Sequence, residues 1–126
     1  MKDKDDFKRI HFGQLPTPFY KLENISKELN HNIFIKRDDM TGVSLGGNKV
    51  RKLEYLLADA QSKGCDYVLT SGGPQSNHAM LTAACANRIG MKSILVLKKR
   101  GVTEKRGNLI LDDLLGADVR FVDSDS

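Results

Sequence analysis

Hydrophobic positions recur at helical spacing in two long stretches of the chain. In residues 48–64 they are Val50, Leu53, Leu56, Leu57 and Ala60. This spacing places them on one face of a helix, and Gly64 is typical of the position just after a helix C-terminus. Residues 76–90 form an Ala-rich stretch that ends at Gly90 in the same way. The small side chains of this stretch favour a second helix that packs closely against a sheet.

Short apolar runs alternate with these helices. They cover residues 66–71, 93–98 and 117–123, and a further helix is expected over 108–116. Runs of this length are typical of buried strands. Because strands and helices alternate, the pattern predicts the α/β class, with an open parallel sheet, helices on both faces and right-handed crossovers.

The first part of the chain is less regular. Pro16 and Pro18 favour extended backbone. Residues 20–32 predict a short helix with an apolar face made by Leu22, Ile25 and Leu29. Residues 33–39 alternate in polarity and predict a strand. Three parallel strands make a thin sheet, and the chain stops where the last one ends, so we expect a fragment of a larger protein.

Composition narrows the function classes. The chain has 126 residues, of which 40% are hydrophobic and 29% charged, with a net charge of +4. These values suit one α/β unit that binds small anions. With 6% aromatic residues and no Trp, base stacking is not expected, and we interpret the basic loop Lys98–Arg106 as solvated. We therefore expect no nucleic-acid partner.

The cysteines and the apolar runs indicate the surroundings. Cys65 and Cys85 have neither metal-binding nor redox spacing, which predicts no metal and a reduced, cytoplasmic setting. No apolar run is long enough to span a membrane, and the charged N-terminus has no apolar core of a signal peptide.

The segment "TSGGPQSNHA", residues 70–79, lies between a predicted strand and a predicted helix. In open parallel sheets this is where ligands bind. Ser76, Asn77 and His78 begin the helix, whose free N–H groups suit an anion. A plain helix cap by Ser76 or Asn77 explains the same letters equally well. Hydrolase chemistry is disfavoured because no GxSxG elbow is present.

The segment "SLGGNKVRK", residues 44–52, places Lys49, Arg51 and Lys52 at a helix N-terminus. That end carries partial positive charge and disfavours cations. The segment is not a P-loop, because Val50 stands where Ser or Thr would hold magnesium, and no GxGxxG is present. An ammonium destabilised in this way favours the neutral amine, which attacks aldehydes. Three solvated surface cations are the alternative explanation.

Together the two segments resemble the family of D-cysteine desulfhydrase and 1-aminocyclopropane-1-carboxylate deaminase, which are pyridoxal-phosphate enzymes of the tryptophan-synthase-β-like fold. "LPTPFYKLENIS", "IFIKRDD" and "GNLILDDLLGADVRFVDSDS" fit the same family, so the resemblance covers nearly the whole chain. It implies pyridoxal 5'-phosphate as cofactor and a homodimeric parent protein. It also implies that residues 1–45 belong to a larger cofactor-binding domain and residues 46–126 begin a smaller one.

The resemblance also implies roles for particular residues. Lys49 is the lysine that forms a Schiff base with the cofactor and then acts as a base. Lys52 contacts the phosphate, and Asn77 binds the hydroxyl of the pyridine ring. Ser76 lies beside the substrate as a second catalytic candidate, and the segment from Ser76 to His78, Asn77 included, binds the substrate carboxylate. Arg51 receives no role.

The implied reaction is elimination of a β-substituent from a small amino acid, as in D-cysteine desulfhydrase, which yields a keto acid and ammonia. His78 favours this reaction over ring opening, because the ring-opening deaminases of the family tend to carry glutamine there. The alternatives are a 1-aminocyclopropane-1-carboxylate deaminase and an inactive truncated piece of such an enzyme. The isolated chain is predicted not to be a working enzyme, because the opposite wall of the site lies beyond Ser126.

Overall fold

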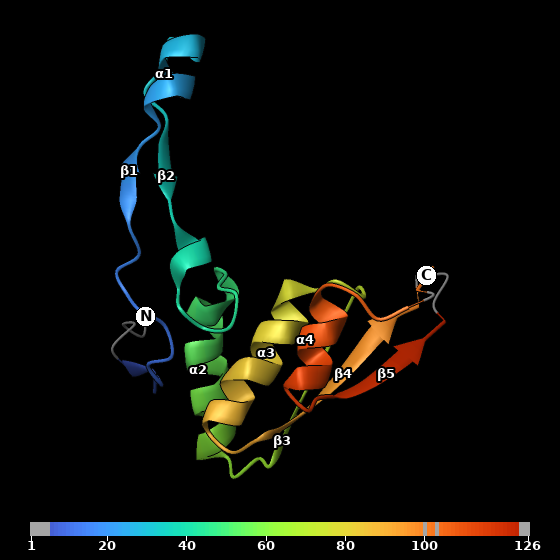
Figure 1. Cartoon of the computed structure of the whole chain (residues 1–126). Coiled ribbons are helices and arrows are strands. Elements are labelled where there is room, and N and C mark those ends of the chain that lie inside the picture. The colour runs from blue at the N-terminus through green and yellow to red at the C-terminus, as the bar shows by residue number, and fades with distance from the viewer. Residues whose placement is uncertain (1–5, 100, 103, 124–126) are drawn as a thin grey trace.

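The computed structural model describes residues 6–99, 101–102 and 104–123, which form a compact body and a protruding arm (Figure 1). The arm consists of β1 (Phe19–Lys21), α1 (Glu23–Leu29) and β2 (Phe34–Lys36). A 3₁₀ helix, η2 (Asp38–Met40), leads from the arm into the body. The elements of the body are α2 (Lys49–Ser62), β3 (Tyr67–Gly72), α3 (Asn77–Arg88), β4 (Lys92–Lys98), α4 (Asn108–Leu114) and β5 (Asp118–Val122).

The body contains the predicted parallel sheet. Its strand order is β3-β4-β5, and both neighbouring pairs are parallel. In register, Thr70 lies opposite Leu95 and Leu95 lies opposite Val119. The prediction of the α/β class with an open parallel sheet flanked by helices is therefore confirmed, but the prediction of helices on both faces is not, because the face that carries Tyr67 and Leu69 is exposed.

Helix α3 is the centre of the body. It packs against β3 and β4, with α2 and α4 beside it (Figure 1). Every residue from Ala79 to Ala86 is buried, because neighbours surround the helix on all sides. Ala79 and Ala83 pack against Leu95 and Leu97 of β4, so the small side chains let the helix approach the sheet closely, as predicted.

The helix ends also follow the sequence. Gly64 and Gly90 have φ angles of +70° and +76°, a conformation that glycine adopts without steric cost, and each follows the C-cap residue of a helix. On the side of the sheet away from α3, Tyr67 and Leu69 are 55% and 66% exposed.

The arm differs from its prediction. Strands β1 and β2 pair antiparallel, and β1 was not expected because three residues are too few to show a period. The strand predicted over residues 33–39 is shortened to Phe34–Lys36, since the backbone turns into η2. Helix α1 forms as predicted, but Ile25 and Leu29 of its apolar face are exposed.

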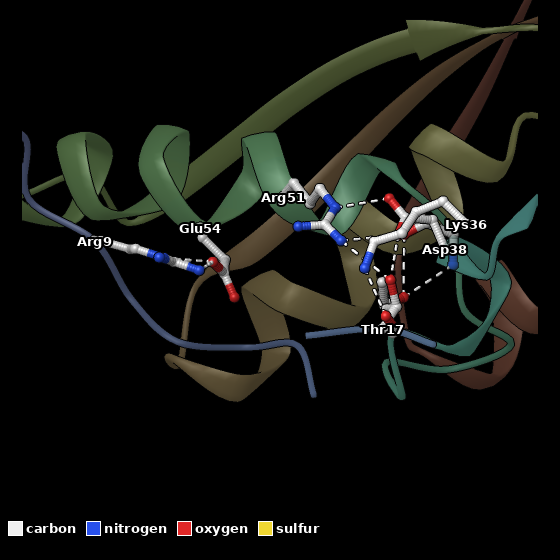
Figure 2. A network of polar contacts seen from close by, with 8 residues as sticks. Arg9, Thr17, Lys36, Asp38, Arg51 and Glu54 are labelled. Carbon is white, nitrogen blue, oxygen red and sulfur yellow. Dashed lines mark hydrogen bonds and ion pairs between the residues drawn. The ribbon is translucent and has the colours of Figure 1, made fainter. Parts of the chain in front are cut away.

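Glu54 of α2 anchors the segment before the arm. Glu54 is fully buried, and its Oε1 accepts the N–H groups of Phe12 and Gly13, each at 3.0 Å. Its Oε2 accepts Nε of Arg9 at 2.6 Å (Figure 2). A glutamate in an apolar helical pattern is usually solvated, so this anchor was not predictable from the sequence.

Candidate active site

Lys49 is the first residue of α2, as the sequence predicted. The first turn of this helix has no acidic residue, and no side chain caps it. Two glycines precede it because no other residue fits. A Cβ on Gly46 would lie 1.7 Å from the carbonyl oxygen of Asp39, and a Cβ on Gly47 would lie 2.4 Å from Nδ2 of Asn77.

Arg51 has a structural partner, which accounts for one of the three clustered cations. Its Nε and Nη2 donate to the two carboxylate oxygens of Asp38 at 2.7 and 2.8 Å (Figure 2). The Thr17 hydroxyl donates to the same carboxylate at 2.7 Å. Arg51 and Thr17 together hold the pKa of Asp38 well below its ordinary value. Arg51 therefore ties α2 to the base of the arm.

Lys49 and Lys52 differ from Arg51. Both are exposed, and among the residues that the structure describes no carboxylate lies within ion-pair distance of either. They lie one turn apart on α2, so both ammonium groups can meet an anion near the start of that helix.

The second predicted segment lies at the start of α3, next to the first. Ser76 caps α3, since its Oγ accepts the N–H of Ala79 at 3.2 Å. A Cβ on Gly72 would lie 2.8 Å from this oxygen, so the glycine makes room for the cap. Nδ2 of Asn77 donates to the carbonyl oxygen of Gly46 at 3.1 Å. This bond joins the two segments that the sequence singled out.

His78 lies in the same region. Its Nδ1 is buried and has no hydrogen-bond partner within the described part of the chain. Burial, followed by the positive charges of Lys52 and Lys49, lowers the pKa of His78 below its ordinary value. The neutral form of the imidazole is therefore favoured, and its buried Nδ1 is a polar atom that a ligand can satisfy.

These groups fit a phosphate-bearing aldehyde. Lys49 and Lys52 offer an amine and a cation, and neither is committed to a carboxylate in the described residues. The N–H groups of Asn77 and His78 begin a twelve-residue helix and have no acceptor within it. His78 Nδ1 adds a buried unpartnered atom. The described residues contain no cluster of His, Cys, Asp and Glu that could hold a metal ion.

Gln75, which directly precedes the Ser76 cap of α3, bonds the loop before α4, and this role was not predicted from the sequence. Its Nε2 donates to the carbonyl oxygen of Arg106 at 2.9 Å, and its Oε1 accepts the N–H of Asn108 at 2.8 Å. A Cβ on Gly107 would lie 2.4 Å from that Oε1. The glycine was the only available signal, and it does not identify a partner 32 positions away in the chain.

The basic loop Lys98–Arg106 is partly paired with acids. Lys105 contacts Asp113 at 2.9 Å, and Arg106 contacts Glu104 at 3.3 Å. Positions 100 and 103 of this loop lie outside the described residues. The helices that the structure describes include none with the length and apolar character needed to cross a membrane.

The fold and the site together define an α/β protein whose lysine-bearing helix start meets the N-terminus of a second helix. The family model of the pyridoxal-phosphate dependent enzymes matches residues 10–126. The chain belongs to this family, which confirms the family and the cofactor that the resemblance implied.

Two relatives are similar to this chain over nearly its whole length. The chain is 46% identical over 122 residues to a 1-aminocyclopropane-1-carboxylate deaminase of Bradyrhizobium diazoefficiens, covering 90% of this chain and 36% of the relative. It is 41% identical over 123 residues to a D-cysteine desulfhydrase of Salmonella typhimurium, covering 94% of this chain and 38% of the relative.

A solved structure described as a homologue of 1-aminocyclopropane-1-carboxylate deaminase is also similar. It matches with a TM-score of 0.91 and 45% identity, covering 97% of this chain and 37% of the solved chain. The chain thus spans little more than a third of the length of the proteins it matches.

Proposed function

We propose that the protein containing this chain eliminates the β-substituent of a small amino acid, with D-cysteine as the substrate. Water completes the reaction, which yields a keto acid, ammonia and sulfide. The observation that carries the proposal is the meeting of Lys49 and Lys52 with the start of α3, through the bond between Asn77 and Gly46. Membership of the pyridoxal-phosphate dependent enzyme family supports it.

When bound, pyridoxal phosphate supplies an aldehyde for amines and a ring that accepts the electron pair of the α-carbon. Lys49 would hold the cofactor aldehyde through Nζ, and the same amine, when free, would serve as the base for the α-proton of the substrate. Lys52 would bind the phosphate. Asn77 would bind the ring hydroxyl with the part of its amide that is not bonded to Gly46.

The start of α3 binds the substrate. Ser76 accepts the Ala79 N–H, so its own hydroxyl hydrogen is available to the substrate carboxylate. The N–H groups of Asn77 and His78 point out of the helix N-terminus and bind the same carboxylate. His78, whose neutral form is favoured, contributes a partly buried imidazole, which would face the β-substituent without adding a third positive charge beside the two lysines.

The role of Lys49 is tested in the full-length protein. Lys49→Ala removes both the visible absorbance of bound cofactor and turnover. Lys52→Ala weakens the affinity for pyridoxal phosphate but leaves turnover at saturating cofactor. Lys63→Ala is the matched control, because Lys63 follows the same helix directly and pairs with Asp59. A Lys49→Ala variant with normal turnover contradicts the assignment.

A second candidate is ring-opening deamination of 1-aminocyclopropane-1-carboxylate, which the Bradyrhizobium relative's name favours. Sulfide release from D-cysteine is measured beside keto-acid release from the cyclopropane substrate. Sulfide release alone supports the first proposal, and ring opening alone supports the second. His78→Gln is expected to lower the rate of sulfide release relative to the rate of ring opening, since it removes the imidazole beside the β-substituent.

The wider organisation is also part of the proposal. We place residues 1–45 in a larger cofactor-binding domain and residues 46–126 in a smaller one, with a cytoplasmic homodimer as the working form. The arm, residues 19–36, stands away from the body and supports this division (Figure 1), whereas Phe12 and Val43 on either side of it pack into the core of the body. We expect the isolated 126-residue chain to hold one wall of the site and to show no substrate-dependent sulfide release.

A further inference from the structure

Thr41 makes two hydrogen bonds to a single residue. Its side chain is fully buried, and its Oγ1 accepts the N–H of Gly47 at 3.0 Å. The same hydroxyl donates to the carbonyl oxygen of Gly47 at 3.1 Å. Both polar backbone groups of Gly47 are therefore held by one side chain. Since Gly47 has a φ of +145°, which it can leave easily, this clamp fixes a residue that is otherwise free to rotate.

The clamp acts directly on the first turn of α2. The carbonyl oxygen of Gly47 also accepts the N–H of Val50, at 3.4 Å. No side chain caps α2. Thr41 therefore supplies the order that a cap usually gives a helix start, although it lies eight positions before Lys49 in the chain.

The opposite side of Gly47 is closed by α3. A Cβ there would lie 2.4 Å from Nδ2 of Asn77 and 2.9 Å from Cδ1 of Leu81. Gly47 is thus held between the Thr41 hydroxyl and α3. Any rotation that the clamp prevents would change the position of Lys49 relative to the start of α3.

The arm contains a matched clamp far from the lysines. Ser26 is buried, and its Oγ accepts the N–H of Ile33 at 3.1 Å and donates to the carbonyl oxygen of Ile33 at 3.4 Å. The chemistry is the same, but no element of the proposed site adjoins it. This pair separates a general effect of losing a clamp from a specific effect on Lys49.

We propose that Thr41 is a positioning residue for Lys49, acting through Gly47 and the first turn of α2. The role rests on the proposed function, because it concerns the lysine that holds the cofactor. Thr41→Val keeps the shape of the side chain but leaves the Gly47 N–H without its acceptor and removes one of the two donors to the Gly47 carbonyl oxygen. Thr41→Ser keeps the hydroxyl and loses only a methyl group.

The experiment compares Thr41→Val, Thr41→Ser and Ser26→Ala in the full-length protein. In Thr41→Val we expect amide hydrogen exchange at Gly47 and Val50 to rise at least about tenfold, with Ile33 unchanged. We expect kcat for D-cysteine to fall by about tenfold while KM changes little. Thr41→Ser restores both values, and Ser26→Ala accelerates exchange only at Ile33. If Thr41→Val does not fold, Thr41→Ala takes its place.

Two results overturn the inference. One is unchanged exchange at Gly47 in the variant that lacks the hydroxyl. The other is an equal loss of kcat in Ser26→Ala, which shows that any lost clamp has the same effect. Exchange is measured without substrate, so it tests the clamp even if the wild-type protein acts on neither amino acid. In that case the proposed function fails, and the exchange at Gly47 and Val50 still shows whether Thr41 orders the start of α2.

Discussion

The arm and the body use apolar side chains in opposite ways. In the arm, Phe19 and Phe34 stack with their ring centroids 5.4 Å apart, yet they remain 64% and 52% exposed. In the body, Leu81 and Leu95 are fully buried between α3 and its neighbours. The body therefore derives its stability from burial, whereas the arm depends on hydrogen bonds in a two-stranded ladder, which is marginal in water.

The largest expected effect is a cavity in the body. Leu95→Ala removes a fully buried side chain from the central strand and should lower the free energy of unfolding by about 3 kcal/mol. Leu29→Ala, at the end of α1, is the control, because Leu29 is 52% exposed and should cost less than about 1 kcal/mol. Urea unfolding measures both, and equal costs would contradict the contrast between the two regions.

The next effect concerns the segment before the arm, which Glu54 anchors to α2. Glu54→Ala leaves the N–H groups of Phe12 and Gly13 without their acceptor and removes the ion pair with Arg9. We expect a loss of about 2–3 kcal/mol, because Arg9 can turn to water while the amides cannot. Limited proteolysis should then cleave near Arg9. Glu28→Ala, on exposed α1, should change neither measurement.

The third effect depends on pH. Asp112 is 1% exposed, its Oδ1 has no partner in the described residues, and burial raises its pKa to about 6. The folded state therefore holds this proton more tightly than the unfolded state. Its contribution to stability is complete below about pH 4 and is lost as the pH rises through about 6.

Asp112→Asn removes that titration. In the wild type this titration should lower the free energy of unfolding by about 2–3 kcal/mol between pH 4 and pH 7.5, and Asp112→Asn should not show that loss. Asp113→Asn is the neighbouring control, since Asp113 is exposed and pairs with Lys105. If Asp112→Asn leaves the pH dependence of the wild type unchanged, Asp112 is already ionised in the folded protein.

The same contrast explains what could be predicted from the sequence. The body was predictable because helices such as α2 and α3 carry local periods, and Gly64 and Gly90 mark their ends. The arm was predicted only in part, because β1 is defined by its pairing with β2 and not by a period of its own.

The candidate site divides in a similar way. The positions of Lys49 and Ser76 at helix starts were predictable from local letters. The contacts of Thr41 with Gly47 and of Gln75 with Asn108 were not, because such partners depend on how distant segments pack. The roles of these residues toward cofactor and substrate stay predictions until the variants are made.

The smallest effect on stability is expected in the arm, at its exposed aromatic pair. Phe19→Ser and Phe34→Ser together should cost less than about 1 kcal/mol, because both rings are already largely in water. The two substitutions should also weaken self-association of the chain, since an exposed apolar strand edge favours pairing between chains.

Sedimentation equilibrium of the 126-residue chain measures that association. We expect the double variant to be less associated than the wild type. Tyr67→Ser is the control in the body, where Tyr67 is 55% exposed on the open side of the sheet. If only Tyr67→Ser reduces association, the chains associate through the exposed face of the sheet and not through the arm. If only the double arm variant reduces association, the exposed aromatic pair of the arm is the surface through which the chains associate.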